Sequence, residues 1–386
     1  MASSRCLQGE RVRLLLVIGS LSGGGAERQM SNIANYWASK GFDVTLATWT
    51  GPQVSDFYEL DPAVRRVHLD VESRPGEWFA ITRTSLRRVL KLRRLLHSAR
   101  PNAVLSFVTE SNVLTVLAHT GLKSRLVVSE RIHPGMHSAL PWTWKLLRKL
   151  VYRWSDAVIA QTREAARWID LNCGATALVI PNALRPLPDA HEQRQPLILA
   201  VGRLVRQKGF DLLLQAFSRI AADFADWNVT IIGDGVEQSR LMSLSRQLQL
   251  GERVTFVGQV RNVEDWMARA GIVVQPSRFE GFPNVVLESM GMGAAVVSSD
   301  CASGPADLIE DGVNGRLVPV EDIDALSRAI TELISQPALR ERLGREALRV
   351  RQRFHQDLIM AQWEDCLLAD HRTVDADVGT GRVNFE

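Results

Sequence analysis

The sequence predicts an α/β protein of two doubly wound, Rossmann-like parallel-sheet domains that face each other across a cleft. Three observations support this fold class. Short, wholly apolar segments alternate with longer amphipathic segments, as in parallel sheets that helices cover on both faces. The chain has 386 residues, enough for two domains of ordinary size. A segment with four prolines, residues 181–196, separates two such alternating series.

Each series supplies the strands of one predicted sheet. Apolar segments of the first series lie at 13–19, 43–49, 103–107, 125–130, 157–162 and 177–182, and its first helix is expected at 26–41. Those of the second series lie at 197–204, 228–235, 253–260, 271–277, 294–299 and 315–320. We therefore expect a first domain at 1–185, a linker at 186–196, a second domain at 197–355, and a C-terminal helix and tail at 356–386. The last helix is expected to pack back on the first domain.

Composition is that of a globular protein, with 46% hydrophobic and 23% charged residues. No window of about 18 apolar residues occurs, so no membrane span is expected. The apolar run that starts at Leu14 is only five residues long, and a first buried strand is preferred over a signal peptide. The four cysteines lie far apart without metal-ligand spacing, which indicates neither a zinc site nor a disulfide scaffold and favours a reducing compartment.

Charge is unevenly distributed along the chain. Residues 1–190 hold 25 Lys and Arg against 15 Asp and Glu, a balance of +10, whereas residues 191–386 balance at −7. The first domain is therefore expected to face an anionic partner. Two basic amphipathic segments, 83–100 and 141–154, are the expected contacts with an anionic membrane surface.

The two basic segments have the following residues on their faces. Segment 83–100 has seven Lys and Arg and no acid, and its apolar face is expected to hold Leu86, Val89, Leu90 and Leu96. Segment 141–154 is expected to place Lys145, Arg148, Lys149 and Arg153 on one stripe, with Trp142, Trp144, Leu147, Val151 and Trp154 as apolar partners. The alternative is a pair of ordinary surface helices with snorkelling cations. Nucleic acid is disfavoured because no nucleic-acid motif accompanies the charge.

Several loops follow predicted strands. Gly23, Gly24 and Gly25 open a helix and could let the backbone approach an anionic ligand, although a tight strand–helix turn is the alternative. Arg203 and Lys208 suit a diphosphate, since neither needs to titrate, and solvated loop charges are the alternative. The loop at Gly258 and Val260 could leave backbone groups free for a base, although an ordinary turn is the preferred alternative.

Two glutamates flank a turn in "RFEGFPNVVLE". Gly281 and Pro283 prevent a helix from reaching back to Glu280, so Glu280 is expected in a loop and Glu288 about one turn inside a helix that Asn284 caps. The pair could be the acid and base of a glycoside hydrolase, sugar-binding groups of a transferase, or ordinary polar residues. The turn lets both carboxylates face one elongated ligand.

Taken together, these motifs resemble the retaining GT-B glycosyltransferases of family four, also called glycosyl transferases group 1. The motifs are Glu280-x7-Glu288, "GRLVRQKG", "SGPADLIEDGVNGRLV" and "GSLSGGGAER", and the resemblance spans roughly residues 12–365. It implies a hexosyltransferase that moves a hexose or N-acetylhexosamine from a nucleotide-sugar, expected to be UDP-linked, to a lipid-linked or cell-surface glycan in polysaccharide biosynthesis. It also implies a cytoplasmic enzyme, peripheral on the inner face of a membrane.

The resemblance also implies roles for individual residues. In the second, nucleotide-sugar-binding domain, Arg203 and Lys208 would contact the diphosphate and Glu288 the ribose. Glu280 would lie by the transferred sugar. The neighbouring backbone contacts would come from Phe282, Pro283 and Asn284. From the first, acceptor-side domain, Gly23, Gly24 and Gly25 would close over the donor.

The acceptor side and the metal requirement are implied less directly. Glu130, Arg131 and His133 compete for one acceptor-side polar position, and Glu130 ranks first, so the expected catalytic set is Glu280, Arg203, Lys208 and Glu130. Asp307 stands where the family often has Glu, which leaves the role of that position open. The resemblance implies that no cofactor or metal is needed. The DxD-like runs 322–324 and 375–377, which fall in a helix start and the tail, also argue against a metal-dependent type.

Two other functions remain open at this point. A glycoside hydrolase would use Glu280 and Glu288 as acid and base and would need no nucleotide. A non-catalytic protein could bind a sugar-nucleotide or a lipid. An NAD-dependent reductase is disfavoured because the first glycine loop lacks its acidic partner in a Rossmann context.

Overall fold

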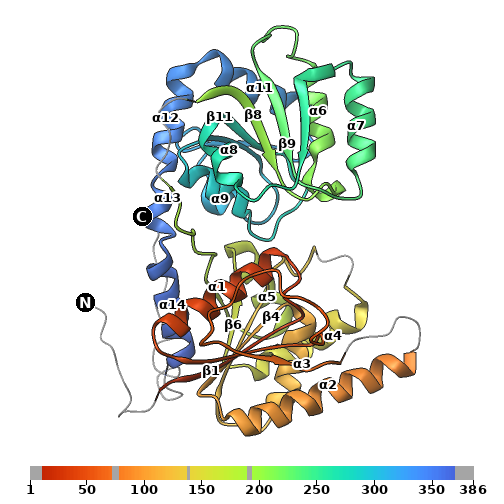
Figure 1. Ribbon diagram of the computed structural model, residues 1–386, viewed down its shortest axis with the longest axis vertical. Coiled ribbons are helices and arrows are strands. Elements are labelled where there is room, and N and C mark those ends of the chain that lie inside the picture. Colours follow the sequence, from red (N-terminus) through yellow and green to blue (C-terminus); the bar gives the residue numbers. More distant parts are fainter. Residues whose placement is uncertain (1–10, 72–77, 137–139, 189–193, 370–386) are drawn as a thin grey trace. The chain divides into compact units, whose positions relative to one another are not determined.

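The computed structural model describes residues 11–71, 78–136, 140–188 and 194–369. Contacts divide the chain into two units (Figure 1). The first unit comprises residues up to Ala160, Ala165–Ile180 and the chain from Met360 on. The second unit comprises Gln161–Glu164 and Pro181–Ile359.

The first unit is built on a parallel sheet of seven strands in the order β3-β2-β1-β4-β5-β6-β7. Its strands are β1 (Arg13–Ile18), β2 (Asp43–Thr48), β3 (Arg65–His68), β4 (Ala103–Phe107), β5 (Arg125–Ser129), β6 (Ala157–Ala160) and β7 (Ala177–Val179). Its helices are α1 (Gly25–Ser39), α2 (Trp78–Ala99), α3 (Thr109–His119), α4 (Trp142–Val151), η1 (Tyr152–Trp154), α5 (Arg163–Cys173) and the C-terminal part of α14 (Gln356–Leu368).

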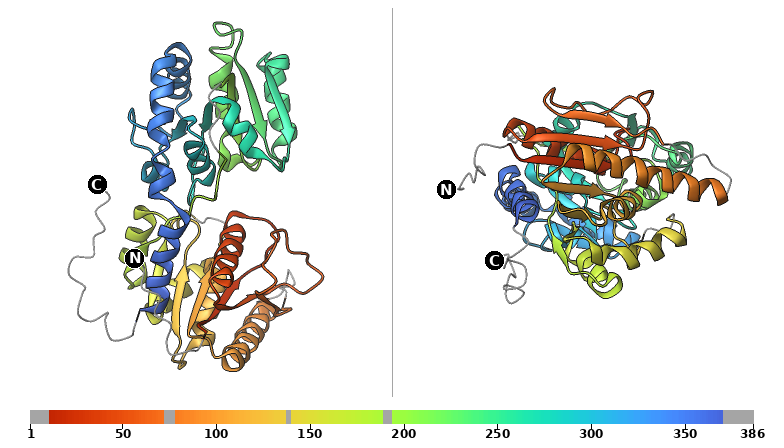
Figure 2. Two further views of the ribbon diagram at one scale, coloured as in Figure 1. Left: turned by 60° about the vertical axis from the view of Figure 1, so that its left-hand side comes forward. Right: turned by 90° about the horizontal axis from the view of Figure 1, so that it is seen from below.

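Alternating strand residues in this sheet point into two apolar layers. Leu15 and Val17 of β1 join a cluster with side chains of α2, α3 and α5. The C-terminal part of α14 also packs within this unit, as Figure 2 shows in dark blue. Its Trp363 lies with its ring 5.8 Å from that of Phe107, and Arg125 donates to the Cys366 carbonyl at 2.5 Å.

The second unit has a six-stranded parallel sheet in the order β10-β9-β8-β11-β12-β13. Its strands are β8 (Gln195–Val201), β9 (Asn228–Ile232), β10 (Val254–Gly258), β11 (Ala270–Gln275), β12 (Ala295–Ser299) and β13 (Arg316–Val318). Its helical segments are η2 (Arg206–Lys208), α6 (Phe210–Ser218), α7 (Gln238–Gln247), η3 (Gly251–Arg253), α8 (Val263–Arg269), α9 (Asn284–Gly291), α10 (Pro305–Leu308), α11 (Ile323–Ser335), α12 (Pro337–Ala347) and α13 (Val350–Arg353).

Strand β8 shows how the second sheet is covered on both faces. Ile198 and Ala200 point into a cluster with α6, α7 and α11, whereas Leu197 and Leu199 point into a cluster with α8 and α9. Figure 1 shows α6 and α7 on one side of these strands and α8 and α9 on the other. The two sheets confirm the predicted doubly wound α/β fold class.

Strand order reverses once in each sheet, between β1 and β4 and between β8 and β11. Loops that leave neighbouring strands at such a point diverge to opposite faces and open a crevice at the carboxyl ends of the strands. The loops that carry Gly23, Lys208 and Glu280 follow β1, β8 and β11, so the topology sets each of them beside the reversal point of its own sheet. The loop at Gly258 instead follows β10 at the edge of the second sheet.

Two details differ from the sequence prediction. Strand β3 was not predicted, because "RRVH" is short and half-charged and lies at the sheet edge. The linker expected at 186–196 is shorter, because β8 already begins at Gln195. Before it, Leu184 is buried and its N–H donates to the Phe354 carbonyl at 2.8 Å, within the second unit. Residues 189–193 and the run 375–377 lie outside the described residues.

Within the part of the chain that the structure describes, no helix has both the length and the apolar character needed to cross a membrane.

Gly233, directly after β9, provides a test of the loop packing. Its φ is +138°, and a Cβ there would lie 1.9 Å from the Gly202 carbonyl oxygen. We expect Gly233→Ala to lower the free energy of unfolding by about 3 kcal/mol or more, from steric overlap and backbone strain. The matched control is Gly251→Ala, with φ +54° and open space around the Cβ, which should cost only about 1 to 2 kcal/mol. Urea unfolding measures both, and equal losses would contradict this account.

Candidate functional site

The loops after β8 and β11 are joined at the reversal point of the second sheet. Gly209 follows η2 with φ +68°, and a Cβ there would lie 2.0 Å from the Pro276 carbonyl oxygen, so only glycine permits this approach. Gln207 makes two bonds across the junction. Its carbonyl accepts from the Arg278 N–H at 2.8 Å, and its side-chain Nε2 donates to the Phe279 carbonyl at 2.9 Å.

The junction brings Lys208 and Glu280 into direct contact. Lys208 Nζ lies 2.6 Å from Glu280 Oε1, and the Glu280 side chain is only 6% exposed. The same oxygen accepts from Ser277 Oγ at 2.6 Å and from Gln275 Nε2 at 3.2 Å. Two residues that the sequence assigned to a diphosphate and a sugar thus lie within hydrogen-bond distance of each other. Their proposed roles remain predictions.

Arg278 holds the loop to the second sheet. Its guanidinium donates to both oxygens of Asp211 at 2.9 Å, to the Arg206 carbonyl at 2.8 Å and to Glu321 at 2.5 Å. The hydrogen bonds with Asp211 raise the pKa of Arg278. Burial alone would raise the pKa of Asp211, but the bonds and charge of Arg278 outweigh burial and lower that pKa. The ion pair therefore fixes the backbone two residues before Glu280.

Glu288 lies in α9 and is buried, as the predicted helix position requires. Its Oε1 lies 3.4 Å from Nε of Arg185, which also pairs with Glu264. Asn284 is the first residue of α9 but makes no side-chain cap, which corrects the expected capping role. Instead its Oδ1 accepts from Asn182 Nδ2 at 2.7 Å, so the start of α9 is held by the segment before β8.

The remaining predicted donor residues differ in exposure. Phe282 and Pro283 are buried, and the Phe282 ring packs at 6.2 Å from the Phe354 ring. Arg203 is exposed at the end of β8, and no side-chain ion pair or hydrogen bond of Arg203 is seen among the described residues. Gly258 ends β10 with φ +80°, and Val260 follows it half-buried.

Gly23, Gly24 and Gly25 form the turn from β1 into α1 within the first unit. Gly24 precedes the helix and its carbonyl accepts from the Tyr58 hydroxyl at 3.1 Å. Gly23 has φ +111°, and a Cβ there would lie 3.3 Å from the Phe57 ring. The amides of this turn open α1, a 15-residue helix, whose N-terminus favours an anion.

Glu130 follows β5 and is almost fully buried in a polar network. Its carboxylate accepts from Thr109 Oγ1 at 2.9 Å and from the Tyr152 hydroxyl at 2.6 Å, and it lies 3.6 Å from Arg148 Nη1. Burial raises the pKa of Glu130, while the charge of Arg148 and the two hydroxyls oppose that shift. Both oxygens are thus engaged inside the first unit. A role on the acceptor remains a prediction.

The two competitors of Glu130 are also buried. The Arg131 guanidinium lies 4.3 Å from the centre of the Phe107 ring, and burial lowers the pKa of Arg131 to about 9. His133 is 6% exposed. Each side chain thus sits below the surface of the first unit rather than on it.

The structure corrects the predicted faces of the basic segment 141–154. Arg148 does not share the cationic stripe, because it is 1% exposed, contacts Glu130, and lies 4.7 Å from the centre of the Trp168 ring. Val151 and Tyr152 are buried as well. The exposed apolar side chains are instead Trp142, Leu146, Leu150 and Trp154, with exposed Lys149 and Arg153 among them.

Segment 83–100 differs from its prediction in a similar way. Leu96 is buried, whereas Leu86 and Leu90, which were expected on the same face, are 59% and 44% exposed. Some of its cations bond to backbone carbonyls: Lys91 donates to Leu69 at 2.7 Å, and Arg93 to Ala118 at 2.9 Å. These cations therefore stabilise loop and helix ends of the first unit as well as adding charge.

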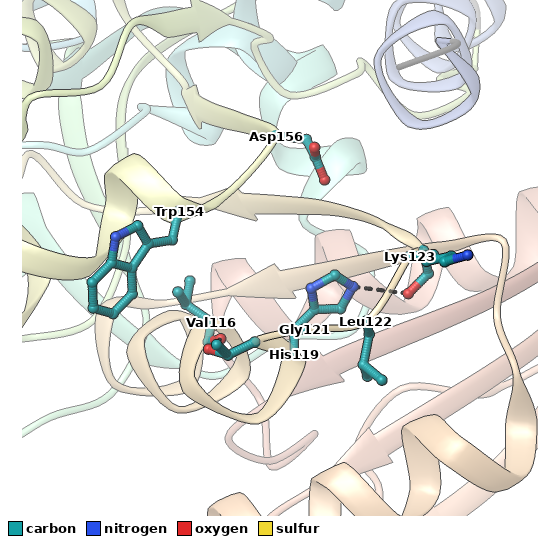
Figure 3. Close-up of a pocket in the computed structure, with 9 residues that line it drawn as sticks. Val116, His119, Gly121, Leu122, Lys123, Trp154 and Asp156 are labelled. Atoms are coloured by element: carbon teal, nitrogen blue, oxygen red, sulfur yellow. Dashed lines mark hydrogen bonds between the residues drawn. The ribbon is translucent and has the colours of Figure 1, made fainter. Parts of the chain in front are cut away.

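A pocket of about 430 Å³ lies in the first unit at the amino ends of β5 and β6 (Figure 3). Val116 and Trp154 line it, and the His119 ring lies 2.8 Å from Ser124 Oγ. Glu130 follows the opposite end of β5. The pocket thus lies at the amino ends of these strands, and the predicted acceptor residues lie at their carboxyl ends.

Sequence reasoning missed the side chains that hold the predicted ones. Gln275 and Ser277 lie directly before the "RFEGFPNVVLE" stretch, and their closeness to Glu280 in sequence was an available signal. The Arg278–Asp211 pair joins residues 67 apart, and the Glu130 network joins residues 22 or fewer apart through different elements. Nothing in the local pattern identifies these longer-range partners.

Two family matches cover most of the chain. Residues 188–350 match the family described as "Glycosyl transferases group 1", and residues 24–183 match the "Glycosyl transferase 4-like domain". Each match falls largely within one of the two sheet-based units.

Individual proteins extend this similarity. Over 218 residues the chain is 34% identical to "Exopolysaccharide phosphotransferase SCO2592" of Streptomyces coelicolor, with 54% of this chain and 23% of that protein covered. It is 25% identical to an undecaprenol-linked "alpha-1,4-N-acetyl-D-galactosaminyltransferase" of Campylobacter jejuni, with 91% of this chain and 97% of that protein covered. The solved structure of Anabaena HepE in complex with UDP shares 20% identity with a TM-score of 0.75, covering 92% of this chain and 99% of that one.

The Asp211–Arg278 pair predicts a pH dependence of stability. Because the pKa of Asp211 is lowered in the folded protein, the pair stabilises it above the unfolded-state pKa of about 3.9 and is lost as pH falls through the folded-state pKa. We expect Asp211→Asn to lower the free energy of unfolding by about 1.5 to 3 kcal/mol at pH 7, and the difference from wild type to shrink on acidification to about pH 3.

The control for this prediction is Asp324→Asn. Asp324 pairs with Arg219 in the same unit, but the two side chains are 70% and 45% exposed. Solvent screening should limit its effect to about 0.5 kcal/mol at either pH. Urea unfolding measures both variants, and an Asp211 effect that does not vary with pH would contradict the assignment.

Proposed function

The chain belongs to the group 1 glycosyltransferases, and on this basis we propose that it is a retaining, metal-independent hexosyltransferase with a UDP-linked donor. The proposed sugar is a hexose or N-acetylhexosamine, and the proposed acceptor is a lipid-linked or cell-surface glycan. The observation that carries the proposal is the junction of Lys208 and Glu280 at the reversal point of the second sheet. It places a cation and a carboxylate where open parallel sheets bind ligands.

Two features support a diphosphate donor in the second unit. Arg203 is exposed directly after β8, and Lys208 lies one short loop further on. Fixed cations suit a diphosphate because they balance its charge and stabilise it as a leaving group. The UDP complex of the similar Anabaena protein supports UDP over other nucleotides.

The proposed reaction proceeds on one face of the donor sugar. The bond from the anomeric carbon to the diphosphate oxygen breaks, and a bond to the acceptor oxygen forms on the same side. The departing diphosphate, stabilised by Arg203 and Lys208, takes the acceptor proton. Glu280 orients the sugar, and Glu288 binds the ribose hydroxyls.

Glycan assembly on a lipid is the proposed context of the acceptor. The Campylobacter jejuni relative is named for an acceptor linked to undecaprenol through a diphosphate. The +10 balance of residues 1–190 and the exposed apolar residues of α4 support a cytoplasmic protein that is peripheral on an anionic membrane.

Calorimetry with UDP tests the donor assignment. We expect the wild type to bind UDP and Arg203→Ala to bind it at least about 10-fold more weakly, because one charge-assisted contact to phosphate is lost. Arg219→Ala is the matched control, since Arg219 is an exposed arginine of the same unit whose partner is Asp324. It should leave UDP affinity unchanged.

The same titration separates the competing functions. A glycoside hydrolase that uses Glu280 and Glu288 would bind no nucleoside diphosphate. A screen of nucleotide-sugars with hydrolysis as the readout separates an enzyme from a non-catalytic binder. Binding of UDP without turnover of any donor would contradict the proposed transferase.

Flotation with vesicles tests the membrane assignment. We expect wild type to float with vesicles that contain anionic lipid and the double variant Leu146→Ser/Leu150→Ser to remain largely unbound, because the apolar face of α4 is lost. Leu171→Ser is the control, since Leu171 is 79% exposed on α5 of the same unit. No flotation of wild type, or equal loss in the control, would overturn the assignment.

A further inference from the structure

Hydrogen bonds to Glu280 are concentrated on one of its two oxygens. Oε1 accepts from Lys208, Ser277 and Gln275, at 2.6, 2.6 and 3.2 Å. Among the described residues, Oε2 accepts no hydrogen bond. The carboxylate is therefore held by one oxygen, and the other remains available to a ligand.

Lys208 is not a dedicated support of this carboxylate if it also binds a diphosphate, because a second anion then competes for its ammonium group. In the structure its ammonium pairs with Glu280. A diphosphate carries more negative charge than one carboxylate and attracts the same ammonium more strongly. The two neutral donors, Ser277 and Gln275, have no such competing role.

These two neutral donors are themselves firmly placed. Ser277 is 1% exposed and Gln275 is fully buried. Gln275 is the last residue of β11, in register with Ser298 of β12, and its Nε2 donates to Ser277 Oγ at 2.7 Å. Ser277 in turn donates to Glu280, so a chain of hydrogen bonds runs from the sheet to the carboxylate.

The orientation of the Gln275 side-chain amide is set by its N–H donors. Its Oε1 is buried without a hydrogen-bond partner in the described part of the chain. An unpaired buried acceptor is unfavourable. Reversing the amide would direct that oxygen at Ser277 and at the carboxylate, so the N–H donors toward Glu280 determine its orientation.

We propose that Ser277 and Gln275 are positioning residues. They keep the Glu280 carboxylate in place when the Lys208 ammonium leaves it to contact the donor diphosphate. The proposal rests on the proposed function and adds a division of labour to it. Lys208 binds the diphosphate of the nucleotide, whereas Ser277 and Gln275 hold Glu280 in position for the sugar. Binding of the nucleotide and orientation of the sugar then depend on different side chains.

Ser277→Ala tests the positioning role by comparing UDP binding with donor turnover. We expect UDP affinity to stay within about two-fold of wild type, while kcat for donor hydrolysis falls by about 10- to 100-fold, because Glu280 loses its alignment. Gln275→Met, which keeps the length of the side chain but removes the donor, should give the same split and serves if Ser277→Ala does not fold. Thermal unfolding midpoints report folding of each variant.

The control is Ser289→Ala. Ser289 is a fully buried serine of α9 in the same unit, and its hydroxyl has no partner in the described structure. Its loss should change neither UDP affinity nor kcat. If both positioning variants match this control in kcat, or lose UDP affinity and kcat together, the positioning role is wrong.

Glu280→Gln tests whether the Lys208 ammonium exchanges Glu280 for the diphosphate. Removing the carboxylate charge frees Lys208 for the diphosphate, so we expect UDP to bind about two- to ten-fold more tightly while donor turnover falls. Unchanged or weaker UDP binding would contradict the proposed change of partner of Lys208. If wild type binds no UDP and turns over no nucleotide-sugar, the proposed function itself fails, and that outcome is distinct from either result above.

Discussion

The close approach of the loops after β8 and β11 is the constraint on which the second unit depends. It requires a residue without a side chain at Gly209, because the Pro276 carbonyl occupies the position of a Cβ. It also requires the strand order to reverse between β8 and β11, which makes their loops neighbours. Given both conditions, Lys208 and Glu280 meet although 72 positions separate them in the sequence. The Arg278–Asp211 pair then prevents the junction from opening.

In the first unit, a pair of opposite charges is buried within a network of hydroxyl groups. Glu130 and Arg148 lie inside, and the Tyr152 and Thr109 hydroxyls satisfy the carboxylate. Removing one partner of such a buried pair leaves an uncompensated charge, whereas exchanging both for apolar groups can be neutral. We therefore expect the network to specify one arrangement of β5, α3 and α4 more than it adds to stability. In the second unit, Arg203 by contrast is exposed after β8.

Much of the fold could be predicted because its signals are local. Apolar runs such as Leu14–Ile18 are buried strands at almost the predicted bounds, and the glycines after them mark the turns. Edge strand β3 was not predicted because two of its four side chains are charged and all four are at most partly buried. Within the candidate site, motif residues such as Glu280 and Lys208 could be named, but not their supports. Arg148 was placed on the wrong face because helical periodicity cannot distinguish a solvated cation from one that a buried carboxylate neutralises.

The position of Arg148 has a consequence for the helix that carries it. Because this arginine reaches inward to Glu130, α4 cannot rotate about its own axis without exposing a charge-bearing network. The buried contact of Arg148 therefore fixes the rotational setting of the helix, in which Leu146 and Leu150 face outward. The outward-facing residues of α4 can then change during evolution without altering the contact between Arg148 and Glu130. The surface of α4 can therefore vary while the buried polar network of the same unit stays the same.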